Sequence, residues 1–425
     1  MDLDEERPVE LLRFLSRLGH ALLATGDTVA RVEWALHRVA RAYGIERVSV
    51  VALPTALWVK LDEGDQTRVD MTSAGRIELR FDQIAAVFTL AEAGARRALT
   101  PAQGLERLQA ILRQPPLYHT SWGIVGHALL TAGLAVILQP SPGVVSAAAV
   151  FGSIVGALKL FARGRGMLET LLPSVAAFLV TAISLFAVEQ GFPARPSAVL
   201  IASLVTFLPG GVLAIAIMEL AYGDVVSGGS RFVTGVAQLL FLALGMIVAT
   251  SLVGLPPAQL FAAVPVGQLG SWAPWLGVVL FAIGTALHYS MALAQIPWLF
   301  VVICVARLAQ LAGGAAFGGY MGGFCGALAM TPVSYFIQYR LAGPPALVTF
   351  PPGLWLLVPG SLGLIGLTEL ASDDHLAGMG DFFTTVMTIT AIALGSMLGA
   401  GLYAALVDPV FARAGSLARR LTIGR

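Results

Sequence analysis

The sequence is poor in charge and in cysteine. Only 12% of its 425 residues are charged, whereas 57% are hydrophobic. Soluble domains carry about 25% charged residues, so this composition indicates an integral membrane protein. The two cysteines, Cys304 and Cys325, both lie in apolar runs, which favours buried thiols over a disulfide framework. The formal net charge of +1 implies no large basic surface for nucleic acid.

Several common functional motifs are also missing. The sequence contains no G-x-x-x-x-G-K-[ST] loop for ATP, no H-E-x-x-H for a metal hydrolase and no G-x-S-x-G for a serine hydrolase. We therefore expect no enzymatic activity, no cofactor and no metal. The N-terminal MDLDEERPVE is acidic and has no short apolar core, so it is unlike a signal peptide.

The first part of the chain carries most of the charge and has the patterns of a small α+β domain. Two helices are predicted from VELLRFLSRLGHALLATG and TVARVEWALHRVARAYG, with stop signals at Gly26 and Gly44 and a candidate cap at Asp27. The segments that alternate like strands are RVSVVAL, TALWVKLD, QTRVDM and RIELRF, and further helices are expected near residues 83–98 and 101–113. We expect this cytoplasmic domain to span residues 1–116.

From Ser121 onward the chain is almost entirely apolar. Ten stretches are long enough to cross a hydrocarbon core of about 30 Å. They lie near residues 121–140, 144–162, 167–189, 197–222, 230–253, 272–292, 295–313, 315–338, 345–371 and 382–407. Their many Gly and Ala residues suit close helix packing in lipid. We therefore expect a multi-pass α-helical protein of the inner (plasma) membrane.

Basic residues set the expected orientation, because Lys and Arg are enriched in cytoplasmic loops. With residues 1–116 in the cytoplasm, the basic residues that fall inside are Lys159, Arg163, Arg165, Arg340, Arg413, Arg419, Arg420 and Arg425. Arg195 is the clear positive charge of an outer loop. Both termini are therefore expected in the cytoplasm.

An internal repeat divides the membrane part into halves at residues 117–258 and 259–425, the second with a short basic tail. At an offset of 150 residues, fourteen of the 37 positions from Pro209 to Gly245 are identical. The identical pairs include Pro209/Pro359, Gly210/Gly360, Glu219/Glu369, Asp224/Asp374, Gly228/Gly378, Thr234/Thr384 and Gly245/Gly395. Each half holds five spans, an odd number, so the second half crosses the membrane in the opposite sense. Such inverted repeats are typical of secondary transporters.

The sequence also resembles a known family. GDTVARVEWALHRVARAYGI, followed by a short strand and ALPTALWV, resembles the N-terminal signature of the threonine/serine exporter family. The two Pro-Gly phrases with Gly-Asp or Asp-Asp endings resemble its two membrane halves. The resemblance implies ten spans, a cytoplasmic head and export of small hydrophilic metabolites, threonine and serine first. Ser361 and Asp373 stand where the first half has Gly211 and Gly223, which argues against a strictly symmetric site.

The Pro-Gly phrase predicts a broken helix. A proline inside a span removes one backbone hydrogen bond and clashes with the preceding turn, so Pro209 is expected to begin a second half-helix. The free N–H groups of Gly210 and Gly211 would then attract a carboxylate inside the membrane. The inverted copy would bring Pro359, Gly360 and Ser361 to the same region. The alternative is a kink that only helps packing.

Four more residues complete the predicted substrate site. Arg307 is a charge within an apolar run, and such charges usually face a cavity or a partner, although snorkelling to the surface is the alternative. Thr331, Ser334 and Tyr335 share a helix face that could line a polar pathway. A hydrogen-bonded seam between helices explains that face equally well.

Glu219, Glu369, Asp224 and Asp374 are the candidates for proton or ion coupling. Burial would be needed to raise the pKa of each carboxyl into a useful range. The two glutamates lie ten residues beyond the prolines, near the membrane surface, where anchoring a helix end is the alternative role. The two aspartates lie in turns, where Asp often bonds its own backbone.

These patterns favour a secondary exporter of small polar carboxylate-bearing metabolites that works by alternating access and exchanges its substrate for protons. Threonine and serine are the first expected substrates. A succinate-like dicarboxylate is the second, because related two-subunit systems are linked to succinate export. A membrane receptor whose N-terminal domain senses a ligand is an alternative from another functional class. The expected partners are the substrate, a coupling ion and the bilayer. The sequence leaves open whether the protein forms a homo-oligomer.

Overall fold

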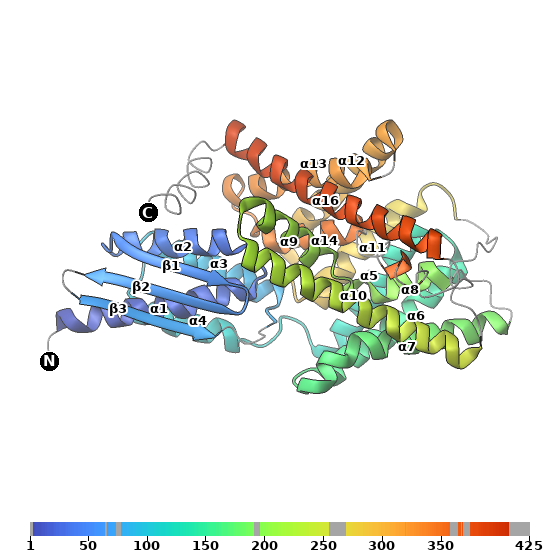
Figure 1. Cartoon of the computed structure of the whole chain (residues 1–425), viewed down its shortest axis with the longest axis horizontal. Coiled ribbons are helices and arrows are strands. Elements are labelled where there is room, and N and C mark those ends of the chain that lie inside the picture. The colour runs from blue at the N-terminus through green and yellow to red at the C-terminus, as the bar shows by residue number, and fades with distance from the viewer. Residues whose placement is uncertain are drawn as a thin grey trace.

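The computed structural model describes residues 3–63, 66–73, 78–190, 196–254, 269–318, 320–357, 364–366, 368 and 375–407. Figure 1 shows an elongated molecule with a sheet and its helices, in blue, at one end. The helices that follow, from green to red, form the rest. We call residues 3–113 the head, since their apolar side chains form a core of their own, with Phe14, Leu36 and Val59 fully buried.

The head consists of helices packed on a three-stranded sheet. The helices are α1 (Leu3–Ala24), α2 (Val29–Ala42), α3 (Phe81–Ala95) and α4 (Pro101–Arg113). The strands are β1 (Arg47–Leu53), β2 (Ala56–Glu63) and β3 (Gln66–Ser73), and they pair antiparallel in the order β1-β2-β3. Alternate residues of β1 are buried, as the period of two in RVSVVAL predicts. The helix stops at Gly26 and Gly44 are confirmed, because both glycines have positive φ.

Two details predicted for the head are wrong. RIELRF was expected to be a strand, but in its described part residues 78–80 are irregular and α3 starts at Phe81. The Gln83 side chain accepts a hydrogen bond from the Arg80 backbone N–H there at 3.1 Å, which helps to start a helix. The cap of α2 is Thr28 rather than Asp27, whose Oδ1 instead accepts a hydrogen bond from the Thr28 N–H.

Each predicted span contains helix in the described residues. The helices are α5 (Thr120–Leu138), α6 (Pro142–Ala162), α7 (Gly166–Glu189), α8 (Pro196–Leu204), η1 (Val205–Phe207), α9 (Gly210–Tyr222), α10 (Val225–Val253), α11 (Ala273–His288), η3 (Leu293–Gln295), α12 (Ile296–Phe317), α13 (Met321–Arg340), α14 (Ala346–Leu357) and α16 (His375–Leu406). Within the described ranges, six helices are long and apolar enough to cross a membrane, or seven with α8 and α9 as one bent span. Ten crossings therefore stay a prediction, because α11 and α14 are short and α13, although long enough, is less apolar than the other helices of the membrane part.

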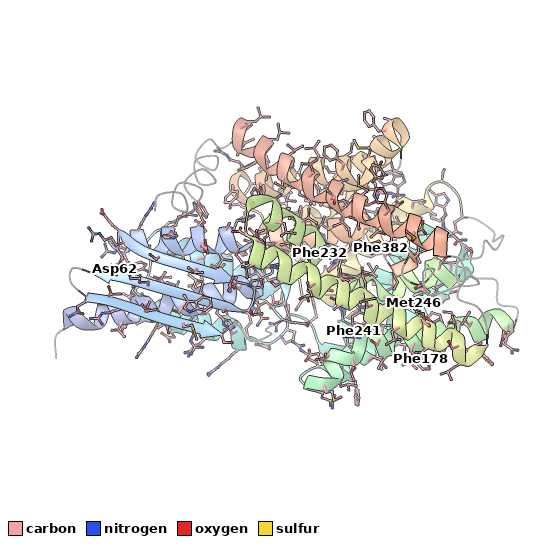
Figure 2. The ribbon with its side chains drawn as sticks, viewed as in Figure 1. Asp62, Phe178, Phe232, Phe241, Met246 and Phe382 are labelled. Atoms are coloured by element: carbon pink, nitrogen blue, oxygen red, sulfur yellow. The ribbon has the colours of Figure 1, made fainter. Side chains whose placement is uncertain are left out.

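The outer surface of these helices is apolar. Phe241 of α10 is 49% exposed and Phe382 of α16 is 38% exposed, whereas Met246 on the inner side of α10 is 1% exposed. Figure 2 labels these three side chains along the two long helices. Many other large apolar side chains on these helices are exposed in the same way. Such side chains are expected on a surface in contact with lipid.

The same helix contact occurs twice, 150 residues apart. A Cβ added to Gly245 of α10 would meet the Ser174 carbonyl of α7 and come within 3.1 Å of the Phe178 nitrogen. A Cβ on Gly395 of α16 would meet the Phe324 carbonyl of α13 and come within 3.2 Å of the Leu328 nitrogen. The glycine and its two partner residues in the first contact are therefore each related to those of the second contact by an offset of 150 residues.

A second glycine contact joins α5 to α11. A Cβ on Gly126 would lie 2.9 Å from the Gly284 carbonyl oxygen, and one on Gly277 would lie 2.7 Å from the Gly133 carbonyl oxygen. Gly126 is thus opposite Gly284, and Gly133 is opposite Gly277, so the two helices run antiparallel. The glycines are seven residues apart in each helix, which lets the two backbones approach closely along one face.

Candidate functional site

The span that contains the Pro-Gly phrase is broken at Pro209. α8 and η1 end at Phe207, α9 starts at Gly210, and the two segments are bent by 58°. A continuous helix would bond the Phe207 carbonyl to the N–H four residues later. Here that carbonyl accepts a hydrogen bond from Gln238 Nε2 of α10 at 2.7 Å. The break predicted from the sequence is present, with Pro209 one position earlier than predicted, as the N-cap.

The first turn of α9 has the donors that a broken helix exposes. The N–H groups of a first turn have no partner within their helix and lie at its positive end. The Leu213 N–H is the first to bond back into α9, to the Pro209 carbonyl at 2.9 Å. Gly210 is buried, and a Cβ on Gly211 would lie 4.0 Å from Leu354 of α14. The start of α9 therefore faces α14.

Polar and basic side chains gather beside the break. We call Thr206, His127, His288, Lys159 and Tyr289 the break cluster. His127 of α5 is fully buried, with Nδ1 2.8 Å from the Gly152 carbonyl and Nε2 3.1 Å from the Thr206 hydroxyl. A carbonyl only accepts, so Nδ1 carries the hydrogen and the neutral ring accepts the Thr206 hydroxyl at Nε2. This bond ties α5 to the turn that precedes Pro209.

Aromatic rings surround the cation of the break cluster. The Lys159 Nζ lies 5.0 Å from the centre of the Phe207 ring and 5.9 Å from that of Tyr289. Tyr289 also stacks on Phe81 of the head, with ring centres 4.9 Å apart. The Phe81 N–H donates to the Tyr289 carbonyl at 2.9 Å. The start of α3 therefore closes one side of the cluster.

A second polar cluster joins the head to the membrane helices. Its members, which we call the head latch, are Asp27, Arg31, Glu219, Arg231 and Tyr335. Glu219 of α9 is fully buried, and its Oε1 accepts a hydrogen bond from the Val29 N–H at 3.1 Å. Val29 is the first residue of α2, so a membrane-helix carboxylate caps a head helix. Arg231 of α10 forms an ion pair with Glu219 Oε2 at 3.1 Å, without hydrogen-bond alignment.

Two arginines complete the head latch. Arg231 also donates to the Asp27 carbonyl at 2.9 Å. The Arg31 Nε pairs with the Asp27 carboxylate at 3.2 Å, and its Nη1 donates to the Tyr335 hydroxyl at 2.6 Å. Burial raises the pKa of Asp27, even though the charge of Arg31 opposes the shift. The head is thus held to α9, α10 and α13 by buried charged groups.

Glu33 and Arg38 fix α2 within the head. The Glu33 carboxylate accepts a hydrogen bond from the Ala52 N–H of β1 at 2.8 Å, and Arg38 pairs with Glu92 of α3 at 2.9 Å. Burial raises the pKa of Glu33 to about 7. The Ala52 N–H opposes this shift, and the negative charge of Asp224 adds to it.

Other predicted site residues lie apart from the break. Arg307 is half-buried and donates to Gln310 of its own helix at 2.9 Å. The hydroxyls of Thr331 and Ser334 bond carbonyls of α13 itself, and Thr331 packs where a Cβ on Gly399 of α16 would lie 2.9 Å away. Tyr335 belongs to the head latch. The hydrogen bonds named here for these four described residues are made away from Pro209.

Asp224 lies in the turn between α9 and α10. It occupies the N-cap position of α10, and its carbonyl accepts from the Gly228 N–H at 2.8 Å. Burial raises the pKa of its carboxyl. The predicted residues of the second half, Pro359, Gly360, Ser361, Glu369 and Asp374, lie outside the described residues. Within the described part, no group of three or more His, Cys, Asp or Glu side chains could hold a metal ion.

Three residues of these clusters were missed in the sequence. His127 is a lone histidine in an apolar run, Thr206 comes directly before FLPGG, and Arg231 follows the repeated glycines. A polar residue inside a span was the available signal for His127 and Thr206. No sequence pattern pairs Arg231 with Glu219, since they lie on different helices.

Apolar helices of spanning length, one of them broken at a Pro-Gly sequence, define a multi-pass membrane-embedded protein. Residues 13–253 match the family model described as "Putative threonine/serine exporter". The chain therefore belongs to the threonine/serine exporter family, whose members are membrane exporters and not a class of enzyme. A protein of Corynebacterium glutamicum named threonine/serine exporter is 22% identical over 418 residues, covering 93% of this chain and 83% of that protein. No solved structure matches the chain.

Proposed function

We propose that this protein is a secondary exporter of small polar carboxylate-bearing metabolites, threonine and serine first. It works by alternating access between the two inverted halves of its membrane part, which lies in the plasma membrane. The head lies in the cytoplasm. The substrate carboxylate binds the first turn of α9. Membership of the exporter family supports the transport role. The observation that supports the mechanism is the break at Pro209, which leaves the first-turn backbone donors of α9 without a partner among the described residues.

The glycine contacts support the inverted halves. Gly245 and Gly395 make the same helix contact at an offset of 150 residues. The antiparallel α5 and α11 are equivalent helices in the predicted repeat, and they meet through reciprocal glycine pairs. A contact between equivalent helices is expected near a two-fold axis between the halves, although Gly126 and Gly133 correspond to Leu276 and Ile283 at the offset of 150 residues.

Proton exchange is the proposed energy source, and the head latch offers a place for it. Protonation of Glu219 would remove its ion pair with Arg231 and weaken its hold on Val29. The coupling role proposed for Glu219 and Asp224 would therefore act by loosening the head from α9. Because α9 begins at the break, such loosening bears directly on the substrate site.

Efflux from vesicles tests the proposal. Purified protein in vesicles loaded with threonine, serine or succinate should release at least one of them, faster when the pH gradient favours proton exchange. Succinate release without threonine or serine release would favour the dicarboxylate alternative. Absence of flux for all three, with and without the gradient, would exclude the exporter.

The break itself is tested by Gly210→Leu and Gly360→Leu. Both substitutions should abolish flux while the folded protein stays in the membrane, because a leucine side chain would crowd the backbone donors. Normal transport in both variants would exclude carboxylate binding at the helix start. A receptor would instead bind ligand tightly and show no flux in any variant.

A further inference from the structure

The break cluster has a cation without an acidic partner. Lys159 of α6 is half-buried, and no ion pair involves it in the described part of the chain. Its ammonium lies against the faces of Phe207 and Tyr289. Ring faces attract a cation only weakly compared with a carboxylate. An ammonium in these surroundings therefore still lacks its strongest possible partner.

The helices that carry the break cluster contain no acidic residue. The helices α5, α6, α8, α11 and α14 contain neither Asp nor Glu. Two histidines belong to the same cluster, because the rings of His127 and His288 are 4.7 Å apart and the His288 ring lies 4.7 Å from that of Tyr289, which faces Lys159. Glu78, exposed on the head, is the acid whose field reaches Lys159. The cluster is therefore arranged for an anion that the described residues do not supply.

Lys159 is also close to the break. Its ring partner Phe207 is two residues before Pro209, and Thr206 of the same turn bonds His127. An anion held by the ammonium would thus lie beside the segment where the helix stops. The cluster borders the head, since Phe81 stacks on Tyr289.

We propose that Lys159 binds the carboxylate of the exported solute at the head side of the break. The inference rests on the proposed function and adds a binding residue for the carboxylate to it. A lysine is a compact point charge, so it suits one carboxylate of a small solute rather than a planar pairing of two groups. The site recognises a carboxylate and rejects the corresponding uncharged amide.

The test compares threonine with threonine amide in vesicle transport. Wild-type protein should prefer the acid. Lys159→Gln should raise the KM for threonine at least tenfold, change the KM for threonine amide less than twofold and so lose the preference. Lys159→Arg keeps the charge and should retain most of the preference. Arg165→Gln is the matched control, because Arg165 is an exposed cation on the aromatic ring of Phe161 near the same end of α6.

The outcomes separate the two proposals. If wild-type protein moves threonine and Lys159→Gln keeps both its KM and its preference for the acid, Lys159 does not bind the carboxylate. If wild-type protein moves no carboxylate at all, the exporter function fails and this inference fails with it. A loss of flux for acid and amide alike in Lys159→Gln, with Lys159→Arg equally inactive, would show a structural role and overturn the assignment.

Discussion

Removing the Glu219 carboxylate should release the first turn of α2. Glu219 is fully buried and caps the Val29 N–H, so Glu219→Leu loses an N-terminal cap and a hydrogen bond to a charged group. A cap contributes about 1 kcal/mol and a charged hydrogen bond about 1.5–3 kcal/mol. Both figures describe the same Val29–Glu219 hydrogen bond, so with about 2 kcal/mol for that bond, and tenfold for every 1.4 kcal/mol, amide exchange at Val29 should become about 30-fold faster.

Hydrogen–deuterium exchange of the full chain in detergent measures this effect directly. A peptide that contains Val29 and starts at least two residues before it reports the latch. Glu169→Gln, an exposed carboxyl in the first turn of α7, is the control and should leave exchange unchanged. Adding Arg231→Met to Glu219→Leu removes the unpaired buried charge and should recover stability but not protection of Val29. Unchanged exchange at Val29 in Glu219→Leu would refute the latch.

Two further predictions concern the repeat and the head. Gly395→Ala and Gly245→Ala each place a methyl group against a carbonyl of the neighbouring helix, so each should lower thermal stability by about 1–3 kcal/mol. Gly401→Ala and Gly229→Ala, on the same two helices in open space, should be neutral or stabilising by up to about 1 kcal/mol; equal melting points for all four variants would contradict the repeated contact. Glu33 has a pKa raised to about 7, so the folded state keeps a proton that the unfolded state releases above its ordinary value. Stability should therefore fall by up to about 3 kcal/mol between pH 4.5 and 7, and Glu33→Gln should lack this part of the slope in unfolding measurements.

The sequence predicted the break because its cause is local. Proline and glycine act through their own backbone, so Pro209 and Gly210 ended one helix and started another wherever the rest of the chain lay. The repeat was visible for the same reason, since identities at a fixed offset need no knowledge of packing. The four head helices and three of the four predicted strands also followed from periodicity.

The contacts between residues of different helices and strands could not be predicted. RIELRF has the alternation of a strand, but the capping side chain of Gln83 and the ring of Tyr289 start a helix at Phe81. Glu219 was a candidate for coupling on spacing alone, and its partners Val29 and Arg231 come from the head and the next helix. Such pairs depend on how helices are placed in space, which no local pattern encodes.

The accessibility of position 211 tests alternating access about the break most directly. A Gly211→Cys variant, with Cys304 and Cys325 replaced by serine, puts one thiol where a Cβ has ordinary contact with Leu354. Membrane-impermeant thiol reagents applied to either side of oriented vesicles should label this cysteine from one side at a time. Threonine added on the other side of the membrane should change the side from which the cysteine is labelled. Labelling from both sides at once, or the same labelling with and without threonine, would contradict the exporter mechanism.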